Sequence, residues 1–351
     1  MDGNTLYKDI QSRAYSAYNM YKNIAKDACP EKWYDSNFKF KIEPNSEING
    51  KSWCEQTTDY VEINQGVIDI YYKYFTEVMQ LRKNEFLSAI LLDKDEAEIN
   101  DMSFEAIVYR NNKIEIIDSK SNDNSMTQLL VIFVSRFILM HELGHLFNGH
   151  CKYLAQFNKN EFNYIPMYYD GNYDLNNKIS ALDVRTMEMD ADAFATTQAF
   201  MHISSLYNNF STEVQIQNMQ PMDLYFWWAF AIRSHYILCE DRFADNHYYP
   251  TMKYLPSCAR WSLVWGSVDA ILESNPSYNR FNKKRVYNEL LNGALCAESM
   301  FNQLKYTSYN WVNQINGNDL FIQYADEVKT HWKSLREHLD PYSRLYLYKN
   351  D

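Results

Sequence analysis

The chain is poor in the two residues that most often interrupt regular secondary structure. Only 9 glycines and 8 prolines occur among its 351 residues. Sandwiches and barrels of short strands need many turns, and turns depend heavily on glycine and proline. This scarcity argues against a turn-rich β architecture and favours long helices.

Positive charge is also scarce. The chain has 34 lysines and arginines against 45 aspartates and glutamates, which gives a formal net charge of −11. Proteins that bind nucleic acid or an anionic membrane surface normally carry a basic excess, because they neutralise phosphate groups. We therefore expect neither nucleic acid nor a membrane surface as a partner.

No segment of the sequence has the length and apolarity of a membrane span. The longest apolar run covers residues 129–140 and contains Arg136, whereas a spanning helix needs about 20 apolar residues. The first residues, MDGNTLYKDIQ, lack the apolar stretch of a signal peptide. The six cysteines form no C-x-x-C pair, so we expect free thiols in a reducing compartment. Together these features predict a soluble protein of the cytoplasm.

The first third of the chain mixes helical and strand-like patterns. Apolar residues at helical spacing predict two helices, over residues 4–27 and 66–83. Alternation of apolar and polar residues predicts strands at residues 37–42, 59–64, 104–109 and 113–117. Asn111-Asn112 between the last two is typical of a hairpin turn. Residues 1–124 are therefore expected to be a mixed α/β part.

From residue 125 onward the patterns are helical. Ser125 and Gln128 fit a capping box, which predicts a helix from Ser125 to about Asn148. Ser180 and Asp183 give a similar signal for the start of the next helix. Both helices belong to a predicted central part, residues 125–210.

The remaining segments complete a single-domain prediction. Residues 151–178 are polar and rich in tyrosine and asparagine, so they predict a long loop or lid. Further helices are expected at residues 221–243, 257–274, 283–304 and 318–339. No repeat or linker divides the chain, so we expect one α+β domain over residues 1–351. Its C-terminal part, residues 211–351, would be helical.

The first of these central helices carries the sequence His141-Glu142-Leu143-Gly144-His145. Residues four apart on an α-helix differ by about 40° in direction, so both imidazoles can bind one metal ion. Glu142 points about 100° away from His141, where a carboxylate can accept a proton from a metal-activated water. By composition alone, this H-E-x-x-H pattern arises by chance in roughly one such chain in a hundred. It predicts a zinc site with a catalytic base.

A zinc site of this kind needs a third protein ligand. His150 is close in sequence, but on a continuous helix it would point about 180° away from His141. We therefore interpret His150 as a cation at the end of the helix, where it is favourable against the dipole. Glu188 is the stronger candidate, because Asp192 lies four residues later on the same helical face. That spacing suits one metal ligand and one carboxylate that orients a ligand histidine.

The segments HELGHLFNGH and EMDADAFA together resemble the glutamate-zincin metallopeptidases, whose pattern is H-E-x-x-H followed by E-x-x-A-D. The resemblance covers residues 141–195 and implies a zincin-like fold. The H-E-x-x-H-x-x-x-G-H form also occurs in soluble ImmA/IrrE-type proteins and Lit-type phage-exclusion peptidases. The size of the chain and the lack of membrane segments favour the Lit type. Carried over by residue, the resemblance implies zinc ligands His141, His145 and Glu188, catalytic base Glu142 and orienting residue Asp192.

A later segment, His247-Tyr248-Tyr249-Pro250 with Arg260 beyond it, is similar to the His-Pro … Arg segment of such peptidases. The two tyrosines between His247 and Pro250 depart from that pattern. His247 or Tyr249 could donate a hydrogen bond to an oxyanion. The alternative is a surface loop between helices.

Three functions follow from these observations. The leading hypothesis is a soluble zinc endopeptidase, for which the Lit-type resemblance implies a protein substrate in the bacterial cytoplasm and a role in phage defence. The second is a zinc-dependent regulator of the ImmA/IrrE kind, with narrow or no proteolytic activity. The third is an interaction protein with a structural metal site. Glu142 argues against the third, because a structural site needs no carboxylate beside an open coordination position.

Overall fold

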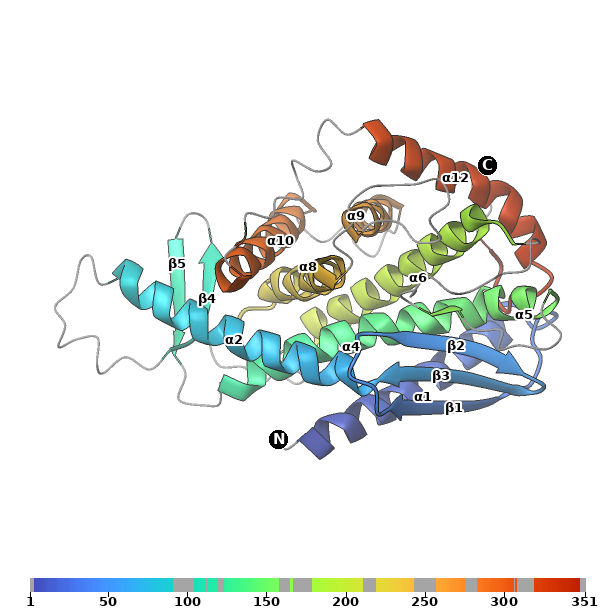
Figure 1. The fold of residues 1–351 in the computed structure, drawn as a ribbon, viewed down its shortest axis with the longest axis horizontal. Coiled ribbons are helices and arrows are strands. Elements are labelled where there is room, and N and C mark those ends of the chain that lie inside the picture. The colour runs from blue at the N-terminus through green and yellow to red at the C-terminus, as the bar shows by residue number, and fades with distance from the viewer. Residues whose placement is uncertain are drawn as a thin grey trace.

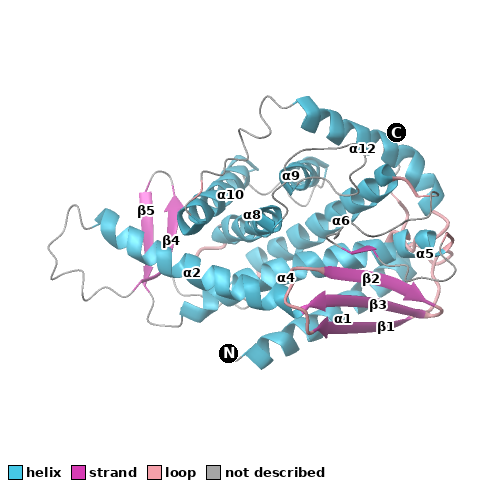
Figure 2. Cartoon of the chain, viewed as in Figure 1, coloured by secondary structure: helices cyan, strands magenta, loops and turns pink. Residues whose placement is uncertain are grey.

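The structure is a computed structural model, mostly helical with one small mixed sheet and a separate strand pair (Figure 2). This is an α+β architecture, as the sequence predicts. The structure describes residues 3–90, 104–110, 113–118, 123–157, 165–166, 179–210, 219–242, 257–274, 283–305, 307 and 319–347.

The described helices follow the sequence prediction closely. Their bounds are α1 (Gly3–Ala28), α2 (Gln65–Ile90), α4 (Asp123–Phe147), α5 (His150–Ala155), α6 (Ala181–Asn208), α8 (Asp223–Arg242), α9 (Ser257–Ser274), α10 (Lys283–Lys305) and α12 (Asp319–Leu339). The predicted capping box opens α6, because Ser180 accepts from the Asp183 backbone N–H while the Asp183 carboxylate accepts from the Ser180 N–H. The predicted start of α4 is wrong. That helix begins at Asp123, an acidic residue that favours the helix N-terminus, so Ser125 lies inside it.

The small sheet has the strand order β1-β3-β2-β6. Its strands are β1 (Asn37–Glu43), β2 (Gly50–Glu55), β3 (Thr58–Asn64) and β6 (Ile165–Pro166). β1 runs parallel to β3, whereas β2 runs antiparallel to both β3 and β6. The other two strands, β4 (Phe104–Arg110) and β5 (Lys113–Asp118), form the predicted antiparallel hairpin, whose turn at Asn111-Asn112 lies outside the described residues.

Three elements were not expected from the sequence. β2 reads GKSWCE, a mostly polar string whose strand conformation is imposed by pairing with β3 on one side and β6 on the other. α5 and β6 both occur within or beside residues 151–178, which the sequence predicts to be a loop. That prediction is wrong where these elements lie, and the rest of the segment is outside the described residues.

Helix α4 forms the centre of the fold. Figure 1 shows it between the small sheet and helices α6 and α8, and it packs against all three. The prediction that no segment has the length and apolarity of a membrane span is wrong by this measure: within the described residues, the stretch Met126–Phe147 is long and apolar enough to cross a membrane. In the structure, 83% of its most apolar window is buried inside the protein. A helix that is apolar on every side is stable when other elements surround it. The core therefore surrounds the H-E-x-x-H residues, which are all buried.

A sharp break separates α4 from α5. Gly149 has a φ of 87°, in the left-handed region, and a Cβ on it would lie 2.6 Å from the Ser343 backbone nitrogen. The neighbouring Arg344 backbone N–H donates to the Phe147 carbonyl at 2.8 Å, so the C-terminal segment packs directly against the break. Because only glycine fits there without strain, the chain can leave α4 and bring His150 back toward it.

Candidate metal centre

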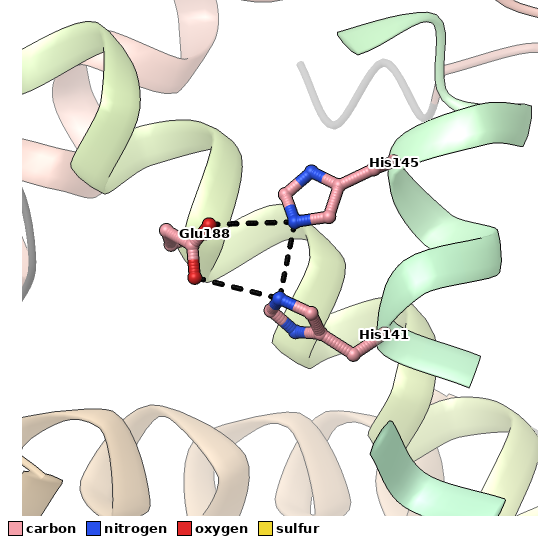
Figure 3. A group of neighbouring side chains, drawn as sticks. All are labelled: His141, His145 and Glu188. Carbon is pink, nitrogen blue, oxygen red and sulfur yellow. Dashed lines mark hydrogen bonds and ion pairs between the residues drawn. The ribbon is translucent and has the colours of Figure 1, made fainter. Parts of the chain in front are cut away.

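Two histidines of α4 and one glutamate of α6 point toward a common position (Figure 3). The Nε2 atoms of His141 and His145 are 3.0 Å apart. Oε2 of Glu188 lies 3.4 Å from Nε2 of His141, and Oε1 lies 3.4 Å from Nε2 of His145. The side chains of the two histidines are fully buried and that of Glu188 is 2% exposed. The structure thus brings together the three residues that the sequence predicts as metal ligands.

The spacing of these donor atoms suits a small divalent cation. Ligand atoms about 2.0–2.1 Å from a tetrahedral ion lie about 3.3 Å from one another, close to the observed separations of 3.0 and 3.4 Å. Gly144 allows this approach, because a Cβ on it would lie 3.2 Å from the Ala191 Cα of α6. The small residues therefore set the distance between the helices, and the group could hold a metal ion.

Asp192 lies behind His141, on the side away from the donor atoms. Its Oδ1 is 2.9 Å from Nδ1 of His141. Arg260 of α9 donates to both oxygens of Asp192, from Nε at 2.8 Å and from a terminal nitrogen at 2.8 Å. A terminal nitrogen of Arg260 also lies 3.4 Å from Oε2 of Glu188. Arg260 thus holds the carboxylate that contacts His141. The resemblance had singled out Arg260 in the sequence, but without this contact.

The charges in this buried group depend on one another. Burial disfavours a charged His141, but Glu188 and Asp192 outweigh it and raise the pKa of His141 to about 10. Burial also opposes the charge of Glu188, but the two histidines lower its pKa to about 2. His145 behaves oppositely, because burial and the neighbouring His141 lower its pKa to about 3. The two acidic residues therefore stabilise positive charge at His141, where a metal cation would compete with a proton.

Glu142 lies next to the three donor residues but does not belong to the group that could hold the metal ion. Its side chain is fully buried, and among the described residues neither carboxylate oxygen has a hydrogen bond of good geometry. Burial raises the pKa of Glu142 to about 8, and His141 and Ser52 only partly offset this effect. The β2 backbone passes close by, since a Cβ on Gly50 would lie 3.0 Å from Oε1 of Glu142. No pattern in the sequence indicates that Gly50 borders the site.

The prediction that His150 points away from the site is wrong. It assumed a continuous helix, whereas the chain breaks at Gly149 and starts α5 at His150. Nδ1 of His150 lies 2.8 Å from Nδ1 of His145, and its side chain is fully buried. His150 therefore lies buried behind His145, beside the group that could hold a metal ion.

The other two predicted site residues, His247 and Tyr249, lie outside the described residues. Comparison with known proteins found no matching family model, no matching curated protein and no matching solved structure. The chemistry of the site therefore follows from its geometry. Two imidazoles and a carboxylate that converge in a buried position can hold a divalent cation. A second carboxylate beside them can accept a proton.

Proposed function

We propose that the chain is a zinc-dependent endopeptidase with a zincin-like arrangement of its central helices. The observation that carries the proposal is the position of Glu142, a buried carboxylate beside the convergent donors His141, His145 and Glu188. Two nitrogen donors and one oxygen donor in tetrahedral spacing suit zinc. When bound, zinc would lower the pKa of a coordinated water and polarise a carbonyl group.

The residues around the donors have separate tasks in this proposal. Glu142 accepts a proton from the attacking water and later delivers it to the leaving amine. Burial raises the pKa of Glu142, so this carboxylate binds a proton more readily than an exposed glutamate does. Asp192, held by Arg260, keeps the proton of His141 on Nδ1 so that Nε2 remains free to bind the cation.

The substrate class comes from the resemblance to the glutamate zincins. The H-E-x-x-H motif and the later glutamate belong to peptidases, so the bond attacked would be a peptide bond of a protein. The similarity to the Lit-type peptidases extends the proposal to a protein substrate inside the bacterial cytoplasm and to phage defence.

The complete burial of the site favours one alternative, a regulatory or interaction protein of the ImmA/IrrE kind with narrow or no proteolytic activity. His141 and His145 are fully buried and Glu188 is 2% exposed, and structural zinc sites are typically closed in this way. A protein of this kind would bind zinc and a dedicated partner without general peptidase activity. Glu142 favours the peptidase, because a purely structural site gains nothing from it.

One comparison separates the two functions. The zinc-loaded wild type, Glu142→Gln and the control Glu273→Gln, on the exposed surface of α9, are expressed in bacterial cells, and new protein N-termini are mapped by mass spectrometry. A peptidase produces N-termini in the wild type and the control that Glu142→Gln does not produce. If all three proteins bind zinc and give identical N-termini, the peptidase proposal fails and the regulatory alternative is supported.

A further inference from the structure

His145 has a polar partner behind it, as His141 does, but that partner is a second histidine. Nδ1 of His145 lies 2.8 Å from Nδ1 of His150. Nε2 of His150 lies 3.1 Å from Oδ2 of Asp190, a distance that a small rotation of the ring would align as a hydrogen bond. Asn148 donates from Nδ2 to the same oxygen of Asp190 at 2.5 Å. The four side chains form a continuous polar chain that begins at a predicted metal ligand.

Burying these four polar side chains is energetically costly unless their donors and acceptors form hydrogen bonds. His145 and His150 are fully buried, Asn148 is 6% exposed and only Asp190 reaches the surface, with 14% of its side chain exposed. Polar groups in such positions normally have hydrogen-bond partners, because an unmade bond in the interior costs about 1–3 kcal/mol. The contacts among these four side chains therefore have to offset the loss of hydration.

A cation at Nε2 of His145 would fix the donor and the acceptor of each hydrogen bond in this series of side chains. A neutral imidazole that binds metal through Nε2 carries its proton on Nδ1. That proton can be donated only to an unprotonated Nδ1 of His150, which places the His150 proton on Nε2, facing Asp190. The Asp190 carboxylate accepts from both His150 and Asn148. Every donor then faces an acceptor, without any additional proton.

Three acidic residues of α6 contact the histidines of this group. Glu188 lies 3.4 Å from both ligand histidines and Asp192 contacts His141, whereas Asp190 lies between them in sequence and contacts His150 instead. Gly149 makes this possible, because its left-handed conformation turns the chain and returns His150 to the back of His145. Both ligand histidines are thus connected to a carboxylate of the same helix, one directly and one through an imidazole.

We propose that His150, oriented by Asp190, is a positioning residue that fixes the tautomer and ring orientation of His145 for metal binding. This inference rests on the metal site of the proposed function, but it does not depend on peptidase activity. Partners that orient a ligand histidine typically change metal affinity by about 10–100-fold when they are removed.

The test measures zinc affinity by competition with a chromogenic chelator. His150→Leu removes both polar contacts and is expected to weaken zinc binding about 10–100-fold. His150→Asn retains an acceptor near Nδ1 and is expected to recover much of that loss, which a purely structural role would not predict. His202→Ala, a histidine of α6 outside this chain of contacts, serves as the control and should bind zinc like the wild type.

A second variant keeps the test decisive if His150→Leu does not fold. Asp190→Ala changes a partly exposed residue, and it is expected to weaken zinc binding by at least severalfold and to alter the visible spectrum of the cobalt-substituted protein. If His150→Leu folds, combining it with Asp190→Ala should add little further loss, because both act through His145.

Two results would overturn the inference. One is wild-type zinc affinity and an unchanged cobalt spectrum in Asp190→Ala and in every His150 variant that folds. The other is a wild-type protein that binds no zinc, which would end the metal site as well. A protein that binds zinc but cleaves nothing would contradict only the peptidase proposal, and the affinities of the variants would still decide the role of His150.

Discussion

Replacing Asp192 by alanine should separate two roles of its carboxylate, one in the stability of the fold and one in metal binding. Asp192 is 1% exposed and contacts Nδ1 of His141 while receiving two hydrogen bonds from the buried Arg260. Removing one partner of a buried ion pair costs about 3–5 kcal/mol, because the other charge remains without compensation. Glu188 stays within 3.4 Å of Arg260, so we expect a loss of about 3 kcal/mol in the free energy of unfolding, at the lower end of that range.

The same substitution should weaken zinc binding, for a different reason. Without Asp192, the proton of His141 is no longer fixed on Nδ1, and the expected loss of affinity is about 10–100-fold. Urea unfolding of the metal-free protein measures the first effect, and chelator competition measures the second. The double variant Asp192→Ala/Arg260→Met removes both charges, so it should regain most of the stability but none of the zinc affinity.

The control is Asp326→Ala, at an exposed position of α12, for which neither quantity should change. The reasoning is refuted if Asp192→Ala unfolds and binds zinc like the wild type. It is also refuted if the double variant regains zinc affinity together with stability, since the two roles would then be one.

Three further predictions concern other parts of the structure. Glu142→Gln should keep wild-type zinc affinity and unfolding midpoint but lose cleavage, because an amide cannot accept the proton; turnover by this variant in a peptide assay would contradict the assignment. Gly149→Ala should destabilise the protein by at least about 1–2 kcal/mol, because its φ of 87° is strained and the new Cβ would meet the Ser343 nitrogen at 2.6 Å; an unchanged urea midpoint would disprove this. Burial opposes the charge of Asp59, but Arg344 outweighs this effect and lowers the pKa of Asp59. The ion pair therefore stabilises the fold at pH values above the unfolded-state pKa of about 3.9, and this contribution is lost as the pH falls below it. Asp59→Asn should therefore be less stable at pH 7 and show a smaller loss of stability between pH 5 and pH 2, and parallel pH profiles for the two proteins would count against the ion pair.

The long helices were predictable because their signals are local. The capping box at Ser180 and the helical spacing of apolar residues depend on neighbours within a few positions. The structure has the helices close to the expected bounds, except that α2 continues to Ile90 instead of ending at residue 83. β2 was not predictable in this way, since its polar residues become a strand only by pairing with β3 and β6. His150 was misplaced for a related reason, because a single glycine at position 149 changed the direction of the chain.

In the candidate site, too, only the residues that are close together in sequence could be placed from the sequence alone. His141, Glu142 and His145 share one helix, so their relative directions follow from the helical repeat alone. Placing Glu188 and Asp192 beside them required the packing of α6 on α4, which the spacing of two acidic residues suggested but could not establish. Arg260 comes from α9, 68 positions after Asp192 in sequence. No local pattern connects residues so far apart, and only the fold brings the guanidinium to the carboxylate.

The energetics of Glu142 bear on which function the site performs. A buried carboxylate without a good hydrogen bond is destabilising, and burial accordingly raises the pKa of Glu142 to about 8. An apolar residue in the same place would avoid this cost without disturbing the donors His141, His145 and Glu188. The Asp192 carboxylate, by contrast, is held by Arg260 and His141 and needs no further explanation. A group that weakens the fold yet stands beside a possible metal position is typical of a catalytic residue, because proton transfer requires a carboxylate that is not already engaged.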